Sequence, residues 1–217
     1  MNCYYCNTRC IKNGKQKNGA QKFHCKNCKK YQQEEYLYNA CRHNTNKGVV
    51  KLLKEGNGVR GISRILEISC TTVLKRIVLI ARQIIKPPIS IGKTYQVDEL
   101  KTFVKKKSME RWLTYAIDSD TKQVVDFRIG RRTKRNLGRV IETLLLSKAK
   151  KIYTDKLNIY RFLIPKAIHG KQWTKTNHIE RKNLTLRTHL KRLNRKTICF
   201  SKSEYMLQAC LTIYFWG

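Results

Sequence analysis

The sequence predicts an α/β protein in which helices cover a mixed sheet and two small segments precede that sheet. Three observations lead to this prediction. Apolar runs typical of strands alternate with helical patterns in residues 94–217. Apolar residues recur at helical spacing in residues 46–86, and two Cys-x-x-Cys pairs lie within residues 1–35. We therefore expect three domains with these boundaries.

The charge of the chain restricts its partners. Lys and Arg number 47 against 14 Asp and Glu, which gives a formal net charge of +33. Such an excess repels itself and favours a polyanionic partner. Nucleic acid is the leading candidate, because neutralising phosphates releases condensed counterions. An anionic membrane surface is the alternative, but a membrane anchor usually concentrates its charge in one amphipathic helix, whereas here the charge is spread over the chain.

Neither a membrane span nor a secretion signal is recognisable. No apolar run approaches the roughly 18–20 residues of a spanning helix, and the N-terminus MNCYYCNTRC lacks the order of a signal peptide. We therefore expect a cytoplasmic protein with no membrane contact, whose cysteines are reduced unless a metal binds them. The odd count of nine cysteines also argues against a complete disulfide framework. The isolated cysteines, expected to pack as small apolar residues, are Cys41, Cys70, Cys199 and Cys210.

The two Cys-x-x-Cys pairs predict a zinc ribbon in residues 1–35. They flank a Gly- and Lys-rich stretch typical of a hairpin, and two such knuckles present four thiolates to one tetrahedral ion. A segment this short buries too little apolar surface to fold alone, so the metal would supply folding energy. The predicted zinc ligands are Cys3, Cys6, Cys25 and Cys28. Disulfides or a redox pair are the alternative, and Cys10 or His24 is a candidate to replace one ligand.

Residues 46–86 predict three short helices in a helix-turn-helix arrangement. The first helical face stops at the sequence Gly-Asn-Gly, and a tight turn separates the second helix from the third. The third helix of such a unit enters the major groove. The residues expected to face DNA are Thr71, Thr72, Lys75 and Arg76. Two positions depart from the common pattern, because Glu67 replaces a glycine and Ser63 a small apolar residue. A plain three-helix bundle is the alternative.

A Pro-Pro linker at residues 86–92 precedes the α/β pattern. Strands are predicted at residues 94–100 (TYQVDEL), 112–117 (WLTYAI), 124–129 (VVDFRI) and 151–154 (KIYT), the second and third joined by a polar turn at 118–122. Helices are predicted at residues 137–147, 158–162 and 176–197, and an apolar segment follows at residues 205–216.

Two of the five aspartates are candidates for chemistry. Asp118 and Asp120 lie in the predicted turn, where Asp is common, and Asp126 is expected on the solvent side of its strand. Asp98 and Asp155, by contrast, fall at the ends of apolar strands. A carboxylate there is desolvated unless something compensates its charge, and a divalent cation would do so.

The predicted helix at residues 176–197 supplies a third carboxylate. Its core stripe consists of Ile179, Leu186, Leu190 and Leu193, and the adjacent polar stripe of Glu180, Asn183, Arg187, Lys191 and Asn194. We expect Glu180 to face the sheet and the predicted DNA contacts of this helix to be Asn183, Arg187 and Lys191. The alternative is that Glu180 merely pairs with its helical neighbours and the helix dipole.

Three carboxylates favour a hard cation such as Mg²⁺, or Mn²⁺ in its place. Two such ions about 3.5–4 Å apart activate a nucleophilic oxygen and stabilise a leaving oxygen in phosphodiester displacement. The predicted ligands of this site are Asp98, Asp155 and Glu180.

Three strings resemble those of bacterial transposases of the insertion-sequence-one family. They are YQVDELKTFV at residues 95–104, IYTDKL at 152–157 and IERKNLTLRTHLKRLNRKTICFSKS at 179–203. The resemblance also extends through the cysteine pairs and the helix-turn-helix pattern. It implies a ribonuclease-H-like catalytic fold with an Asp-Asp-Glu triad at Asp98, Asp155 and Glu180.

The resemblance further implies metal-dependent nicking of double-stranded DNA at the element ends, followed by attack of the freed 3′-hydroxyl on target DNA. The N-terminal domains would recognise the terminal inverted repeats, the protein would act as a homo-oligomer, and it would associate with the bacterial nucleoid. His169 occupies a position where related sequences carry a His, with either a structural role or a contact to the scissile phosphate. A DNA-binding regulator or a ribonuclease-H-like nuclease remains the alternative.

Overall fold

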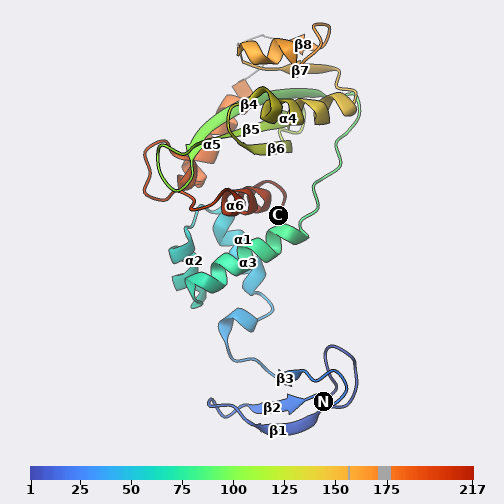
Figure 1. Cartoon of the computed structure of the whole chain (residues 1–217), viewed down its shortest axis with the longest axis vertical. Helices are drawn as coiled ribbons and strands as arrows, with labels where there is room; N and C mark the ends of the chain where they lie inside the picture. The colour runs from blue at the N-terminus through green and yellow to red at the C-terminus, as the bar shows by residue number, and fades with distance from the viewer. Residues whose placement is uncertain (156, 171–176) are drawn as a thin grey trace.

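The computed structural model describes residues 1–155, 157–170 and 177–217. It contains a three-stranded antiparallel sheet, a group of three helices, and a five-stranded mixed sheet with helices on both faces (Figure 1). The predicted α/β class with a mixed sheet is therefore confirmed. Within the described ranges, no helix has both the length and the apolar character needed to cross a membrane.

The three-stranded sheet lies at one end of the molecule (Figure 1). Its strands are β1 (Ile11–Lys15), β2 (Gln21–His24) and β3 (Tyr31–Gln33), paired in that order. Gly19, with φ of 80°, lies in the turn that joins β1 to β2, where a left-handed residue is needed. The buried apolar cluster of this region consists of three cysteines and Phe23. So small a core favours a metal as the main source of stability.

Three helices follow a short 3₁₀ turn, η1 (Asn39–Cys41). They are α1 (Thr45–Lys54), α2 (Val59–Leu66) and α3 (Cys70–Gln83). Glu67, between α2 and α3, has φ of 52°, so it adopts the left-handed conformation that glycine usually supplies. The Ser63 hydroxyl donates a 2.6 Å hydrogen bond to the carbonyl of Ile68, which satisfies both groups in the turn. Ser69 then caps α3 by accepting from the N–H of Thr72 at 3.0 Å.

The five-stranded sheet has the order β6-β5-β4-β7-β8. Its strands are β4 (Thr94–Phe103), β5 (Glu110–Asp118), β6 (Val124–Gly130), β7 (Lys151–Tyr153) and β8 (His169–Gly170). β4 pairs in parallel with β7, and β7 with β8, whereas β4, β5 and β6 form an antiparallel meander. The two-residue strand β8 is too short to be recognised from the sequence.

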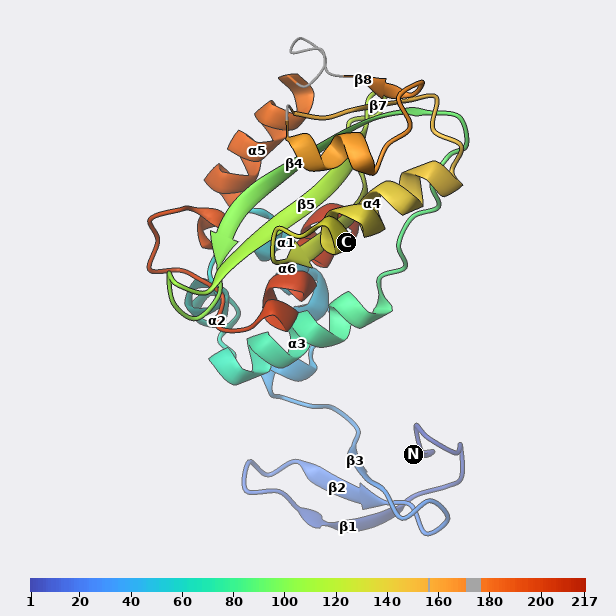
Figure 2. The ribbon, with the colours of Figure 1, turned by 45° about the horizontal axis from the view of Figure 1, so that its top comes forward.

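Helices cover both faces of this sheet (Figure 2). They are α4 (Lys134–Leu146), η2 (Asn158–Phe162), α5 (Asn177–His189), η4 (Lys191–Leu193) and α6 (Glu204–Trp216). Side chains of β4 alternate between the faces. Tyr95 and Val97 pack with α4 and η2, and Leu100 packs with α5 and α6. Neighbouring residues of β4 therefore pack on opposite faces of the sheet.

The C-terminal helix α6 packs against the sheet and against the three helices. Leu207 and Leu211 belong to the cluster that contains β4, β5 and α5. Ala209, Cys210 and Ile213 belong to the cluster that contains α1, α2 and α3. Figure 1 shows α6 between these two parts of the molecule. The apolar run at the end of the chain is thus shared by two cores.

Three expectations about local structure were wrong: the end of one helix, the burial of three cysteines and the orientation of Asp126. The helix predicted for residues 176–197 ends at His189, because Leu190 leaves helical geometry with ψ of 84° and η4 turns back against β4. Of the isolated cysteines, only Cys210 is buried. Those exposed are Cys41, Cys70 and Cys199.

Asp126 is buried, although the alternating pattern predicted a solvent-facing side chain. The pairing of β5 with β6 contains an irregularity, where Ala116 faces Asp126 and Ile117 faces Val124. This extra residue in β6 reverses the alternation beyond it. The Asp126 carboxylate is compensated by Lys86 of the linker, with 2.8 Å between Oδ1 and Nζ.

Candidate functional site

Four cysteine sulfur atoms come together at the end of the three-stranded sheet. The ligand atoms of Cys3, Cys6, Cys25 and Cys28 all lie within 4.8 Å of one another, and they form the only such group found among the described residues. Cys3 and Cys28 are 3.5 Å apart, as are Cys6 and Cys25. These separations exceed a disulfide bond and approach the roughly 3.8 Å between sulfurs on a tetrahedral zinc ion.

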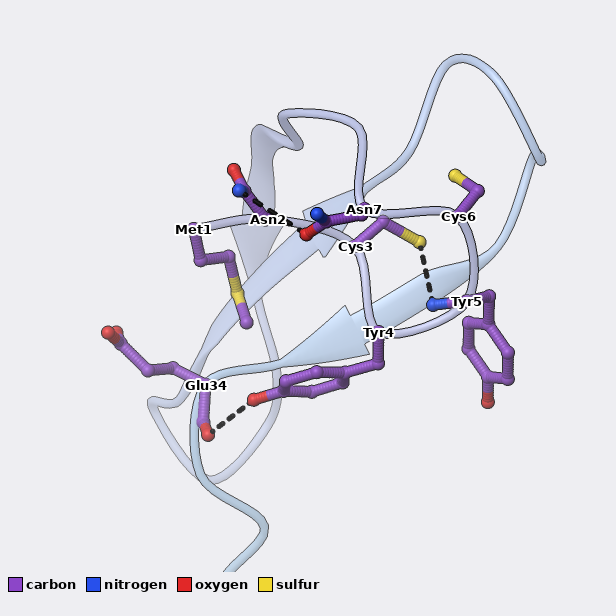
Figure 3. A pocket seen from close by; sticks show the side chains of 8 residues that line it. All are labelled: Met1, Asn2, Cys3, Tyr4, Tyr5, Cys6, Asn7 and Glu34. Atoms are coloured by element: carbon purple, nitrogen blue, oxygen red, sulfur yellow. Dashed lines mark hydrogen bonds between the residues drawn. The ribbon is translucent and has the colours of Figure 1, made fainter.

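The two knuckles repeat one backbone geometry. The N–H of Asn7 donates to the carbonyl of Cys3, and the N–H of Lys29 donates to that of Cys25, both at 2.9 Å. Asn7 and Lys29 are left-handed, with φ of 56° and 60°. In the first knuckle the N–H of Tyr5 donates to the sulfur of Cys3 at 3.4 Å (Figure 3). Backbone donors aimed at a sulfur stabilise the thiolate that binds metal.

The two proposed substitute ligands lie outside this group of sulfurs. Cys10 is buried nearby, but its sulfur does not share the 4.8 Å group. The His24 ring stacks on Tyr31, with 4.5 Å between ring centroids. The donor set of four soft sulfurs therefore fits zinc without either residue.

Asp98 lies in the interior of β4, on the face covered by α5. Its Oδ1 accepts from the N–H of Glu99 at 2.7 Å, and its Oδ2 accepts from the amide of Asn183 at 2.6 Å. Burial raises the pKa of Asp98 to about 6, with a further increase from the charge of Asp155, while the two hydrogen bonds act in the opposite direction. A cation beside this carboxylate would offset its desolvation.

The contact with Asn183 fixes how α5 meets the sheet. Tyr115 of β5 is buried, and its hydroxyl donates to Asn183 Oδ1 at 2.8 Å. Because this bond occupies the amide oxygen, the amide nitrogen is directed at Asp98. The N–H of Ile179 also donates to Gln96 Oε1 of β4, at 3.1 Å. Side chains of Gln96, Asp98 and Tyr115 of the sheet thus hold the first turns of α5.

Asp155 is exposed and lies two residues after the end of β7. The expected desolvation is therefore seen for Asp98, which lies within β4 and not at its end, but it is not seen for Asp155. Asp155 Oδ1 accepts from the N–H of Leu157 at 3.0 Å, which stabilises the turn that leads into η2. Its position next to β4 follows from the parallel pairing in which Gln96 lies opposite Tyr153.

Glu180 is exposed in the first turn of α5. It precedes Asn183 by three residues, so the two side chains lie on the same side of the helix. Since Asn183 contacts Asp98, this side of α5 faces the carboxylate of β4. The structure does not bring the oxygens of Asp98, Asp155 and Glu180 within 4.8 Å of one another. Carboxylates repel one another because their charges have the same sign. Their oxygen donors are of the kind that suits Mg²⁺ or Mn²⁺.

The residues predicted to contact DNA occupy two helical regions. On α3, Thr71 and Lys75 are exposed, whereas Thr72 bonds Ser69 and Arg76 donates to the carbonyl of Ala40 at 2.7 Å. These last two side chains are engaged within the protein.

The second predicted set lies around the end of α5. Arg187 donates to the carbonyl of Leu193 at 2.7 Å, and Lys191 is exposed in η4. Asn183 is engaged by Tyr115 and Asp98. His169 Nε2 lies 2.8 Å from the hydroxyl of Thr154, next to Asp155. Among the predicted residues, Thr71, Lys75 and Lys191 are thus the most accessible to a nucleic acid.

Glu99, which sequence reasoning did not single out, is a buried carboxylate beside Asp98. Its side chain is 1% exposed and pairs with Arg132, with 2.7 Å between Oε2 and Nη2. The hydroxyl of Tyr160 donates to its other oxygen. An acidic residue directly after Asp98 in an apolar strand was the available signal, but its partners come from distant segments.

Comparisons with known proteins point to one family. A family model described as IS1 transposase matches residues 93–215. The chain is 38% identical over 108 residues to the insertion element iso-IS1n protein InsB of Shigella dysenteriae, which covers 50% of this chain and 82% of that protein. It is 39% identical over 119 residues to the insertion element IS1 9 protein InsB of Escherichia coli K12, which covers 55% of this chain and 71% of that protein.

A solved structure is also similar, though more distantly. It is the simian T-cell lymphotropic virus intasome in complex with PP2A regulatory subunit B56 gamma. The similarity has a TM-score of 0.40 at 15% identity and covers 76% of this chain and 67% of that chain. This likeness is too weak to establish a shared fold.

Proposed function

The chain belongs to the IS1 transposase family, and from this premise we propose that it is a DDE transposase. It would bind the terminal inverted repeats of an insertion sequence and catalyse metal-dependent phosphodiester cleavage and strand transfer. In this proposal the α/β domain has a ribonuclease-H-like fold, and its substrates are the double-stranded DNA of the element ends and the target.

The observation that carries the proposal is the hydrogen bond from Asn183 to Asp98. It joins α5, which bears Glu180, to the strand that bears Asp98. The parallel pairing of β7 with β4 brings the segment that bears Asp155 alongside. The helix that bears Glu180 and the segment that bears Asp155 thus lie next to β4, the central strand of the sheet. The net charge of +33 also favours binding of the chain to DNA.

Asp98, Asp155 and Glu180 are the residues that would hold Mg²⁺ or Mn²⁺. When bound, such a cation lowers the pKa of a coordinated water and stabilises charge on phosphate oxygens. Asn183 keeps Asp98 oriented toward α5, and the buried Tyr115 keeps Asn183 oriented in turn. Arg187 and Lys191 are proposed to hold the phosphate backbone at the far end of α5.

DNA recognition is assigned to the N-terminal half of the chain. The four-cysteine group would bind structural zinc, and α2 and α3 would form a helix-turn-helix. Left-handed Glu67 and the cap at Ser69 support this assignment, because they produce a tight turn between the two helices. Since transposition joins two DNA ends, we also propose that the protein acts as a homo-oligomer.

The test is cleavage of a duplex that carries the inverted repeats flanking the gene. Asp155→Asn and Glu180→Gln should each reduce the rate by at least about 1,000-fold in Mg²⁺, while binding to the same duplex without Mg²⁺ persists. Asp120→Asn is the matched control, because Asp120 is an exposed aspartate in the turn between β5 and β6 that pairs with Lys93. Retained cleavage by both site variants would remove the catalytic assignment.

A DNA-binding regulator is the second candidate function. It is favoured because the cysteines proposed for DNA recognition lie within 4.8 Å of one another, whereas the carboxylates proposed for catalysis do not. Wild-type protein that binds the repeats but cleaves them in neither Mg²⁺ nor Mn²⁺ would support it. A nuclease of the same fold would instead cleave without transferring strands.

A further inference from the structure

We infer that Glu99, Arg132 and Tyr160 form a brace that positions Asp155 relative to Asp98, so that Tyr160 is a positioning residue for the cation site. The inference rests on the proposed function, because it concerns the same three carboxylates. It adds residues that are not among the proposed cation ligands. The brace is defined as Glu99, Arg132 and Tyr160.

Glu99 is the centre of the brace and lies on the opposite face of β4 from Asp98. Oε2 accepts from Arg132 Nε at 3.2 Å and from Nη2 at 2.7 Å. Oε1 accepts from the hydroxyl of Tyr160. The Arg132 guanidinium also lies over the Trp112 ring, 4.5 Å from its centroid. Both oxygens of this buried carboxylate are therefore engaged within the protein, on the face of β4 opposite to Asp98.

Tyr160 connects Glu99 to the turn that bears Asp155. Its side chain is fully buried, so its hydroxyl needs a partner inside the protein. Its N–H donates to the carbonyl of Leu157 at 3.2 Å, and the N–H of Leu157 donates to Asp155 Oδ1 at 3.0 Å. A short series of hydrogen bonds thus runs from Glu99 to Asp155. Because Asp155 is exposed, this series is a main source of order for its carboxylate.

The adjacency of Asp98 and Glu99 gives the brace its geometric effect. Consecutive residues of one strand hold a fixed separation and point to opposite faces. Asp98 therefore sets one position of the site, and Glu99, through Tyr160, sets the position of the segment that carries Asp155. The contact with Arg132 holds the Glu99 side chain in place, and the other carboxylate oxygen accepts from the tyrosine hydroxyl.

Tyr160→Phe tests the brace, since it removes one hydroxyl and keeps the packing of the ring. The matched control is Tyr95→Phe. Tyr95 is also fully buried in the same apolar cluster, but its hydroxyl donates to the carbonyl of Ser90, at 2.7 Å, in the linker. The measurement is Mn²⁺ binding to the full zinc-loaded chain, followed by the electron paramagnetic resonance signal of free Mn²⁺.

Removing a group that orients a metal ligand typically weakens metal affinity by about 10–100-fold. We expect Tyr160→Phe to weaken Mn²⁺ binding by about 10-fold, whereas Tyr95→Phe stays within about twofold of wild type. Thermal unfolding of both variants without Mn²⁺ reports the purely structural loss, which should be similar for the two. Equal Mn²⁺ affinity of Tyr160→Phe and wild type would overturn the brace.

A wild-type chain with no Mn²⁺ site, or one whose affinity is unchanged in Asp155→Asn, would instead contradict the proposed function itself. The two failures are therefore distinguishable in one titration series. Glu99→Gln gives a second, stronger perturbation. It retains an acceptor for Tyr160 but removes the charge that pairs with Arg132, so it should also weaken Mn²⁺ binding.

Discussion

In the N-terminal ribbon, four sulfurs from two short knuckles lie within 4.8 Å of one another, whereas the carboxylates of Asp98, Asp155 and Glu180 do not gather so closely. Each knuckle is fixed by a hydrogen bond across five residues. The carboxylates instead depend on β4, the segment after β7, and α5. One site is built locally and the other by packing of distant elements.

The difference follows from the amount of apolar surface that each region buries. The ribbon has an apolar cluster of little more than cysteines and Phe23, so we expect its folding to be coupled to metal binding. The carboxylate site lies on a sheet whose faces are covered by large apolar clusters. Apolar packing stabilises that sheet, whereas the three carboxylates lie apart from one another.

The largest effect should come from breaking the local site. Cys25→Ser, or removal of zinc by a chelator, should unfold residues 1–35 because about 10–16 kcal/mol of metal binding is lost. The rest of the chain should stay folded, since its cores contain no ribbon residue. Zinc content and limited proteolysis measure both outcomes.

Cys10→Ser is the control for this experiment. Cys10 is buried in the ribbon but lies outside the sulfur group, so zinc content should remain at wild-type level. Loss of cooperative unfolding across the whole chain in Cys25→Ser would contradict the independence of the two regions.

A smaller effect of opposite sign is expected at the carboxylate site. The pKa of Asp98 is about 6 in the folded chain against an ordinary 3.8, so the folded state holds a proton more tightly than the unfolded state. This ionisation destabilises the fold above pH 6 and has no effect below pH 4. Asp98→Asn should therefore raise the free energy of unfolding by about 1–3 kcal/mol at pH 7.5, without added Mg²⁺.

The pH dependence distinguishes this cause from general stabilisation. The gain of Asp98→Asn should shrink as the pH falls from 6 to 4, as measured by urea unfolding at each pH. The exposed Asp120→Asn should show no such trend. An equal gain at pH 7.5 and pH 4 would mean that desolvation of Asp98 is not the cause.

The smallest effect concerns the contact that joins α5 to the sheet. Tyr115→Phe removes the donor to Asn183 Oδ1 and should lower the free energy of unfolding by about 1 kcal/mol. Tyr205→Phe is the control, because the Tyr205 hydroxyl is exposed and accepts from Arg82 at 2.8 Å. If urea unfolding shows the same loss of stability in both variants, the buried contact of Tyr115 contributes no more to the free energy of unfolding than the exposed contact of Tyr205.

The candidate site was predictable in part. The strand patterns around Asp98 and Asp155 and the helical pattern around Glu180 sufficed to select these residues. The hydrogen bonds of Glu99 to Arg132 and Tyr160 join residues 33 and 61 positions apart, which no local pattern reveals. Asp126 was assigned to the wrong side because an irregularity in β6 depends on its pairing with β5.

The sequence by itself determined the longer strands and helices, the cysteine knuckles and the sign of the charge, because these depend on spacing and composition over a few residues. Only the tertiary structure decided that α5 ends at His189, that α6 is shared by two cores and that Asn183 bonds Asp98. Such contacts depend on which distant surfaces pack together. A local sequence pattern restricts which surfaces can pack together, but only the packing of the whole chain decides which of them do.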